Sequence, residues 1–292
     1  MKLGLVGSEM CIRDRIIAKT HASVQNFGEG AVTADHWARQ SVRAGGVVQF
    51  DTLVIEETTQ LEVQLWADIC KVSLSERVQF ILCGDPQQFP AICESWVGCP
   101  VQDGALERSH MLQDLANGNR LTLRENKRSD QMLFDFYSSL STRPLEEALR
   151  DARIRFPVSG RDATTLVISH ARRRYLNMQR NLKDKPPGAI FFRAPVTGNA
   201  NGTGPQSMFL WPGIHVIGAG PPLKKGVFET VLSVTSDEVV LHNGTRLTAH
   251  QAVRSLKLAY ALTYPSCQGL TISGVVRLDC TSNIHFTLKH LY

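Results

Sequence analysis

The sequence predicts an α/β fold built on parallel β-sheets, and three observations support this prediction. Short apolar runs of strand type alternate along the chain with longer segments of helical periodicity. Polar side chains directly follow two of the strand-like runs, as they do where a parallel sheet carries a site at the carboxyl ends of its strands. The length of 292 residues suits two domains of roughly 150 residues each.

The composition is that of a globular chain with a mild positive charge. Hydrophobic residues make up 43% of the sequence and charged residues 20%, which is enough apolar material for a core. The net charge of +5 permits nucleic acid as a partner without requiring it. No stretch approaches the roughly 18 apolar residues of a membrane span, so no membrane association is expected. Seven cysteines without a Cys-x-x-Cys spacing predict reduced thiols and an intracellular location, nuclear or cytoplasmic.

The first domain is expected to begin near Ile16. Residues 1–15 are set apart as a non-native leader, because their second half resembles the translation of a sequencing adaptor. The apolar run Arg15–Ala18 predicts a strand, and short helices are expected near Ser23–Phe27 and from Thr33 to Gln40, with Thr33 as the cap.

The next segment predicts two neighbouring parallel strands with a helix between them. Leu53–Ile55 and Val78–Cys83 are buried-strand patterns, and Leu61–Val72 has apolar residues at helical spacing. Carboxylates follow the first strand, and Gly84-Asp85-Pro86 follows the second. Since the carboxyl ends of parallel strands share one edge of a sheet, both polar clusters are expected there.

A second αβ region follows, interrupted by short strands. The expected helices are Gln131–Leu140, Pro144–Arg155 and the basic Ala171–Lys185, and the expected strands are Thr164–Ser169, Ala189–Arg193, Leu258–Thr263 and Val275–Leu278. Between residues 206 and 255, four or five short strand-like runs separated by turns predict a small β-barrel. Its clearest turn is the hairpin signal His242-Asn243-Gly244.

Two of these segments resemble motifs of nucleotide hydrolases. Phe50-Asp51-Thr52-Leu53-Val54-Ile55-Glu56-Glu57 resembles a Walker B strand, in which one carboxylate binds Mg²⁺ and the next orients the attacking water. Gly84-Asp85-Pro86-Gln87-Gln88-Phe89-Pro90 resembles motif III of superfamily 1 helicases. An acidic pair after a strand is a weak signal by itself, and motif III at the expected distance makes it specific.

Further segments resemble other motifs of that family in the family's order. Ala18–Ser23 resembles motif Ia, Leu121–Ser129 resembles motif IV, and Ala261–Thr271 resembles motif V. From Ile16 to Tyr292 the chain therefore resembles a superfamily 1 DNA helicase of the RecD-like branch.

The resemblance implies a P-loop NTPase fold with two RecA-like domains, the second interrupted by the barrel. The expected bounds are 16–118 for the first domain, 119–205 and 256–292 for the second, and 206–255 for the barrel. The implied function is an ATP-dependent DNA helicase that uses ATP and Mg²⁺ to move along single-stranded DNA, with RNA as an open alternative. The protein is expected to be monomeric.

The resemblance also assigns roles to ten residues. Glu57 would act on the attacking water, and Gln88 and Arg128 would contact the γ-phosphate. Glu56 would hold Mg²⁺. The remaining nucleotide-site residues are Asp85, Gln268 and Gly269, and the residues expected to hold the DNA strand are Thr20, His21 and Thr271.

The departures from the family pattern leave other interpretations open. Glu56 stands where the family usually has Asp, and Pro265-Ser266-Cys267 replaces the family's His-Lys-Ser. The sequence contains no Gly-x-x-x-x-Gly-Lys-Ser/Thr and stops before motif VI, so a fragment that is inactive alone is expected. The alternatives are a catalytically inactive nucleic-acid-binding or structural remnant, and a RecA-like ATPase that acts on RNA.

For several other residues the simplest interpretation is structural. Trp37 is expected to anchor its helix to the sheet, and Trp66, Trp96 and Trp211 are expected in the core or the barrel. The basic side chains of Ala171–Lys185 are expected to form a solvated helix face.

Overall fold

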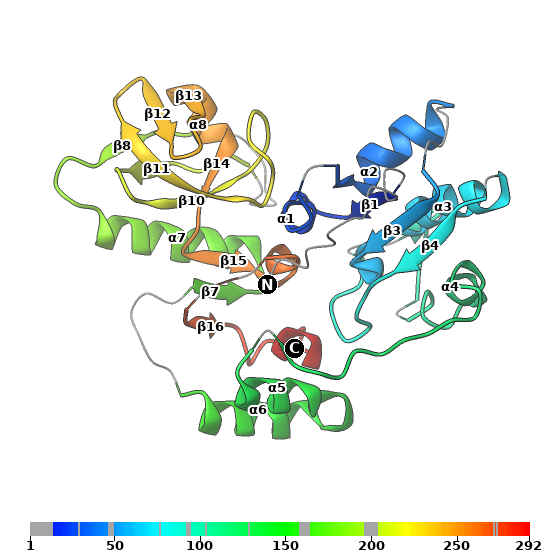
Figure 1. Cartoon of the computed structure of the whole chain (residues 1–292). Helices are drawn as coiled ribbons and strands as arrows, with labels where there is room; N and C mark the ends of the chain where they lie inside the picture. Colours follow the sequence, from blue (N-terminus) through cyan, green and yellow to red (C-terminus); the bar gives the residue numbers. More distant parts are fainter. Residues whose placement is uncertain are drawn as a thin grey trace. The chain divides into compact units, whose positions relative to one another are not determined.

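The computed structural model describes residues 14–28, 30–45, 50–75, 77–91, 95–102, 104–127, 129–157, 164–195, 204–270, 272 and 274–292. The chain divides into two compact units (Figure 1). The first unit runs to Pro144 and includes Leu291–Tyr292, and the second is Leu145–His290.

The first unit is built on a four-stranded parallel sheet with the order β2-β1-β3-β4. Its strands are β1 (Asp14–Ala18), β2 (Val32–Thr33), β3 (Thr52–Glu56) and β4 (Gln79–Leu82). The strands predicted at 53–55 and 78–83 are thereby confirmed as parallel neighbours, side by side in Figure 1. β1 begins at Asp14, two residues inside the segment expected to be a leader.

Helices of the first unit cover this sheet and close its core. They are α1 (His21–Gln25), α2 (Ala34–Trp37) with a π-helical continuation over Ala38–Arg43, and α3 (Val63–Ser75). The predicted spacing on α3 is confirmed, since Leu65, Ile69 and Val72 are buried together with the sheet residues Leu53 and Ile55. This burial of one helix stripe supplies the apolar contacts that hold α3 against the strands.

The remainder of the first unit contains elements that the sequence pattern does not predict. A short hairpin joins β5 (Ser95–Trp96) to β6 (Cys99–Pro100), and α4 (His110–Leu115) follows.

The predicted helix at 131–140 is present as α5 (Gln131–Ser138), with a 3₁₀ turn over Leu140–Thr142.

The tryptophans of this unit have different environments. Trp37 is 2% exposed and packs near Phe50, as expected of an anchor. Trp66 is also buried, but Trp96 is 45% exposed, so the prediction of a core position for Trp96 is wrong. Trp96 lies on the separate two-stranded hairpin, outside the core that packs on the four-stranded sheet.

The second unit contains a three-stranded parallel sheet with the order β15-β7-β16. β7 (Thr164–Val167) is the central strand, between β15 (Ala261–Thr263) and β16 (Val276–Leu278). α6 (Leu145–Arg155) precedes β7, and the long α7 (His170–Asp184) follows it. These elements confirm the predicted αβ character of this region.

A five-stranded antiparallel sheet with the order β13-β12-β11-β10-β14 forms most of the rest of the second unit. Its strands are β10 (His215–Gly218), β11 (Phe228–Val234), β12 (Glu238–Leu241), β13 (Arg246–Thr248) and β14 (Leu256–Leu258). The hairpin predicted at Asn243-Gly244 joins β12 to β13 and is confirmed. α8 (Ala249–Ser255) packs on this sheet, while β8 (Ile190–Phe192) and β9 (Met208–Leu210) pair separately. Closure into a barrel stays a prediction.

The run 258–263, predicted as one strand, divides between the two sheets. β14 ends at Leu258 and pairs with β10, whereas β15 begins at Ala261 and pairs with β7. The buried side chain of Asn177 on α7 bonds to the backbone on both sides of the break. Its amide nitrogen donates to the carbonyls of Leu258 (3.2 Å) and Ala261 (3.1 Å), and its oxygen accepts from the Ala261 N–H (2.7 Å). The amide therefore satisfies the backbone groups that the break leaves without strand partners.

Asn181, one turn further along α7, repeats this pattern on another strand. Its side chain exchanges two hydrogen bonds with the backbone of Phe209 in β9, at 2.9 and 2.8 Å. The last elements of the chain are the 3₁₀ turn Tyr264–Cys267 and α9 (Leu288–Leu291). Among the described helices, none is both long and apolar enough to cross a membrane.

Candidate functional site

The carboxyl edge of the first sheet brings the predicted polar clusters of that unit together. In the strand register, Ala18 lies opposite Glu56, and Ile55 lies opposite Leu82. The segments that follow β1, β3 and β4 therefore leave the sheet at one edge, where ligands of parallel sheets bind. The last residue of β3, Glu56, lies at this edge, and the segments that follow contain five more of the predicted site residues: Thr20, His21, Glu57, Asp85 and Gln88.

Glu56 is the half-buried last residue of β3. Its carboxylate accepts hydrogen bonds from the Cys83 thiol and from the Glu57 backbone N–H. Burial raises the pKa of Glu56, and these hydrogen bonds offset part of the rise. Burial and the adjacent Glu56 charge raise the pKa of Cys83 to about 11, so the thiol stays protonated and serves as a donor.

Glu57 begins the loop after β3 in a left-handed conformation, with φ 53°. This geometry, unusual for a residue with a side chain, turns the chain into the 3₁₀ turn Thr58–Gln60. The Gln60 amide donates to the Glu57 carboxylate at 3.1 Å and helps to orient it. Residues held in such conformations cluster at functional sites, and Glu57 is the only one of the ten predicted site residues among the positive-φ non-glycine residues described.

The ends of β3 and β4 are joined by a close backbone contact. The Thr58 N–H donates to the Cys83 carbonyl at 3.0 Å. A Cβ atom on Gly84 would lie 1.9 Å from Thr58 Oγ1 and 3.2 Å from the Thr58 backbone nitrogen. Glycine at position 84 therefore permits an approach that a side chain would block.

Asp85 organises the loop that carries Gln88. Its carboxylate accepts from the Gln87 N–H at 3.0 Å, and its backbone carbonyl accepts from the Gln88 N–H at 3.1 Å. Asp85 also accepts a hydrogen bond from the Tyr292 hydroxyl. Burial and the Asp85 carboxylate raise the pKa of Tyr292, so the hydroxyl remains a donor.

The segment after β1 is held by interactions that the sequence pattern does not indicate. Lys19 forms ion pairs with Asp35 (3.0 Å) and Glu62 (2.5 Å). Burial alone would lower the pKa of Lys19, but the hydrogen bonds to the two carboxylates raise it above its ordinary value. Thr20 caps α1 by accepting from the Ser23 N–H at 3.1 Å, and His21 is exposed at the first position of that helix.

The motif V segment lies in the second unit, directly after β15. Ser266 and Thr263 share a hydrogen bond of 2.6 Å, and the Cys267 thiol donates to the Tyr264 carbonyl. Gln268 follows in an extended conformation, and Gly269 has φ 74°, where glycine is favoured. Arg128 and Thr271 lie outside the described residues, so the structure gives neither a position.

A cationic cluster lies around the start of α7, and the sequence analysis missed it. Its members are His170, Arg173, Lys225 and Lys257. Arg173 is 6% exposed, although the helix was expected to present a solvated basic face. Burial, followed by the charges of Arg173, Lys257 and Lys225, lowers the pKa of His170. Burial, followed by the charges of Arg173 and Lys225, lowers the pKa of Lys257 to about 8. Cations that destabilise one another in this way favour a bound anion.

The signals for these features lie partly in the sequence. Basic residues at positions 170, 173 and 174 lie in the first turns of α7, but Lys225 comes from the turn before β11 and Lys257 from β14. Their convergence depends on the tertiary fold.

We predict that Gly84→Ala lowers the free energy of unfolding by about 1–3 kcal/mol, because the new methyl group collides with Thr58. In the double variant Gly84→Ala/Thr58→Ala the Oγ1 atom is absent, so part of the lost free energy of unfolding should return. Urea denaturation measures both, with Gly220→Ala as the control, since nothing lies within 4 Å of a Cβ atom there. A loss no larger than in the control would contradict the tight contact.

We predict that Lys257→Met raises the free energy of unfolding at pH 7. Because the folded pKa of Lys257 is about 8 and lies below its ordinary value of 10.5, the unfolded chain holds more protons between these pH values. Wild-type stability should therefore rise with pH across this window relative to the variant, and the variant's advantage should shrink. Urea denaturation from pH 7 to 10.5 tests this, with the exposed Lys183→Met as control. A pH-independent difference would refute it.

The fold itself has clear counterparts among known proteins, although the sequence does not. No protein-family model and no curated protein matches the chain. Structures of Pif1 helicases do match. One, of two Pif1 helicases unwinding forked DNA, has a TM-score of 0.63 at 13% identity and covers 96% of this chain and 78% of its own.

Two further Pif1 structures agree. Pif1 from Candida albicans has a TM-score of 0.62 at 17% identity, covering 95% of this chain and 80% of its own. Pif1 from Bacteroides, in complex with ADP-AlF₃ and single-stranded DNA, has a TM-score of 0.59 at 13% identity, covering 96% and 84%. At these identities the likeness establishes the fold alone: the chain has a mixed α/β architecture with parallel sheets that matches the fold of these Pif1 helicase structures.

Proposed function

We propose that this chain belongs to an ATP-dependent DNA helicase that couples ATP hydrolysis to movement along single-stranded DNA. The observation that carries the proposal is the joined carboxyl edge of β3 and β4. Glu56, Glu57 and the Asp85–Gln88 loop lie there within a framework fixed by the Thr58–Cys83 hydrogen bond. The fold likeness to Pif1 structures supports it, one of which contains ADP-AlF₃ and single-stranded DNA.

In this proposal each residue at the edge has a defined part. Glu57, oriented by Gln60, positions the attacking water and accepts its proton. Gln88 and Arg128 contact the γ-phosphate, while Asp85 shapes the loop that presents Gln88. Gln268 and Gly269 complete the nucleotide contacts, and Thr20, His21 and Thr271 hold the DNA strand. We also propose two RecA-like domains, the antiparallel sheet as the small inserted barrel, and a monomeric protein.

The Glu56 carboxylate suits a Mg²⁺ site that the nucleotide completes. Among the described residues, no group of three or more His, Cys, Asp or Glu side chains could hold a metal ion. Mg²⁺ in phosphate-transfer sites takes one or two carboxylates, and substrate phosphates and waters supply the other ligands. Bound Mg²⁺ would neutralise charge on the phosphates, and Glu56 would hold it directly or through water.

The cationic cluster at the start of α7 supports the nucleic-acid part of the proposal. Arg173 and Lys225 both lie within electrostatic reach of Lys257. A phosphate backbone would relieve their repulsion, and such contacts carry no sequence information directly.

A second candidate function is a nucleic-acid-binding remnant without hydrolysis. The observation that favours it is the Glu56 carboxylate, which already accepts two protein hydrogen bonds and has a raised pKa. The two hydrogen bonds and the raised pKa both make the Glu56 carboxylate a weaker ligand for Mg²⁺. The two candidates differ in hydrolysis and agree in binding nucleic acid.

For hydrolysis, we predict that Glu57→Gln lowers DNA-stimulated turnover by about 10²–10⁴-fold while ATP binding survives, because an amide cannot accept the proton. The measurement is phosphate release from ATP by the protein that carries this chain together with a phosphate-binding loop. Glu146→Gln, at an exposed position of α6, is the control. Wild-type protein that binds DNA but does not hydrolyse ATP would favour the remnant.

For binding, we predict that the chain binds single-stranded DNA without sequence preference and with an affinity that falls steeply with salt. Lys225→Gln should weaken binding equally for two unrelated oligonucleotides and reduce the salt slope by about one. Fluorescence anisotropy at several salt concentrations measures this. Lys71→Gln, whose lysine pairs with Asp68 on α3, is the control. An affinity that does not change with salt concentration would contradict the proposal that the chain binds nucleic acid.

A further inference from the structure

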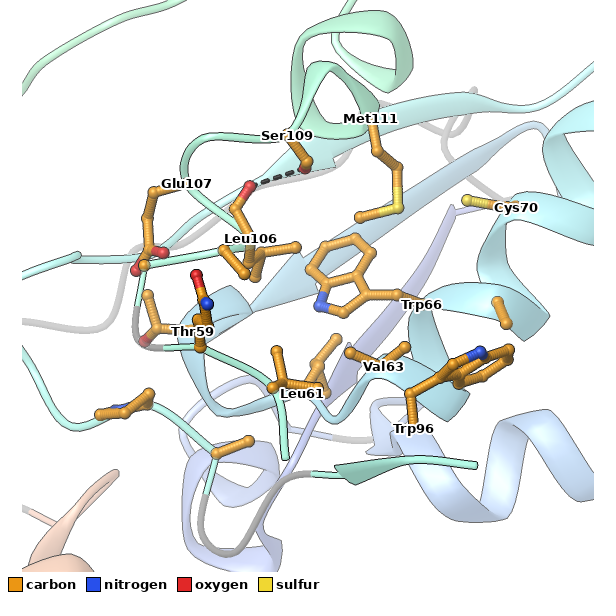
Figure 2. A pocket seen from close by; sticks show the side chains of 17 residues that line it. Thr59, Leu61, Val63, Trp66, Cys70, Trp96, Leu106, Glu107, Ser109 and Met111 are labelled. Atoms are coloured by element: carbon orange, nitrogen blue, oxygen red, sulfur yellow. Dashed lines mark hydrogen bonds between the residues drawn. The ribbon is translucent and has the colours of Figure 1, made fainter. Parts of the chain in front are cut away.

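A pocket of about 590 Å³ lies in the first unit, apart from the residues assigned above (Figure 2). Its walls come from the segment before α3 and α3 itself, from the residues after the Gln88 loop, from the β5–β6 hairpin and from the turn that leads to α4. This volume falls in the range of roughly 300–1,000 Å³ that small-molecule sites occupy.

The lining is mostly apolar and aromatic. In Figure 2 the indole of Trp66 lies in the middle of the lining, with Leu61, Val63 and Trp96 drawn below it, Met111 above it and Leu106 to its left. The one charged side chain among the described lining residues is Glu107, which is exposed. Such walls favour a planar, uncharged molecule, and the Glu107 carboxylate disfavours an anion.

Two buried polar groups in this lining lack a hydrogen-bond partner within the described part of the chain. They are the indole N–H of Trp66, a residue that is 2% exposed, and the hydroxyl of Thr59, a residue that is 7% exposed. Buried polar groups are rarely left in this state, because each loses its hydrogen bonds to water. By contrast, the Ser109 hydroxyl in the same lining donates to the Leu106 carbonyl at 2.7 Å.

The chemistry of these two groups specifies what a ligand must provide. An indole N–H can only donate, whereas a threonine hydroxyl can donate or accept. A molecule with a ring nitrogen or a carbonyl oxygen would satisfy Trp66 and place its apolar body against the aromatic walls.

We propose that this pocket binds a neutral, planar aromatic molecule of two or three rings that accepts a hydrogen bond from the Trp66 indole. The site does not depend on nucleotide or DNA binding. It does adjoin the loops of the carboxyl edge, since the Thr59 carbonyl accepts from the Ala91 N–H at 2.9 Å.

Quinoline is a suitable probe, because it is neutral near pH 7.5 and carries one acceptor nitrogen. Naphthalene has the same shape without the acceptor, and 2-naphthoate adds a negative charge. The readout is the set of indole N–H signals in protein labelled with nitrogen-15 at its four tryptophans. Trp66→Phe identifies the Trp66 signal.

We expect quinoline to move the Trp66 signal downfield in a saturable manner. Naphthalene and 2-naphthoate should bind at least several-fold more weakly and cause no such downfield shift. Trp37 is the internal control, because its indole N–H is also buried without a partner among the described residues but does not line the pocket. Its signal should stay in place.

Ala105→Phe provides a second test, since it fills the pocket from the turn before α4 and leaves Trp66 intact. The quinoline shift should disappear, while the Trp37 and Trp211 signals report that the variant is folded. A Trp66 signal that quinoline leaves unmoved up to its solubility limit would overturn the proposal. Equal shifts with naphthalene, or equal shifts of all tryptophans, would overturn it as well.

Discussion

The close approach of the ends of β3 and β4 is the constraint on which the candidate site depends. Two backbone hydrogen bonds, from the Thr58 N–H to the Cys83 carbonyl and from the Cys83 N–H to the Ile55 carbonyl, join these ends, and Gly84 makes the close approach sterically possible. Several other contacts follow from it. The Cys83 thiol can reach the Glu56 carboxylate, and the Ala91 N–H can reach the Thr59 carbonyl. Backbone hydrogen bonds therefore position Glu56 and Thr58, the two neighbours of Glu57 in the sequence.

Sequence reasoning predicted the elements whose pattern is local. Buried parallel strands such as β3 and β4 are continuous apolar runs, and the carboxylates after Ile55 mark a strand end without any knowledge of neighbours. The same reasoning failed where the deciding partner is distant in sequence. Lys19 is held by Glu62, 43 residues away, and Asn177 divides the run 258–263 across 81 or more residues. The exposed Trp96 and the buried Arg173 reverse the usual preferences of their residue types, which only the packing around them explains.

The fold is recognisable at 13–17% identity, where no family model matches the sequence. This is possible because a parallel sheet constrains its sequence only loosely. It requires apolar residues in the strands, glycine at a few close contacts, and helices with one apolar stripe. The chemistry of a site restricts the choice of residues more narrowly than packing does. In the proposed function the short segments around Glu57 and Gln88 carry the chemistry, and packing alone does not require their polar pattern.

The two asparagines of α7 have a mechanical consequence for the second unit. Because Asn177 is bonded to the backbone at the β14–β15 break and Asn181 to β9, the helix cannot roll about its axis or slide without breaking buried hydrogen bonds. α7 therefore links β9 to the β14–β15 break, and neither can shift along the helix while these hydrogen bonds are kept.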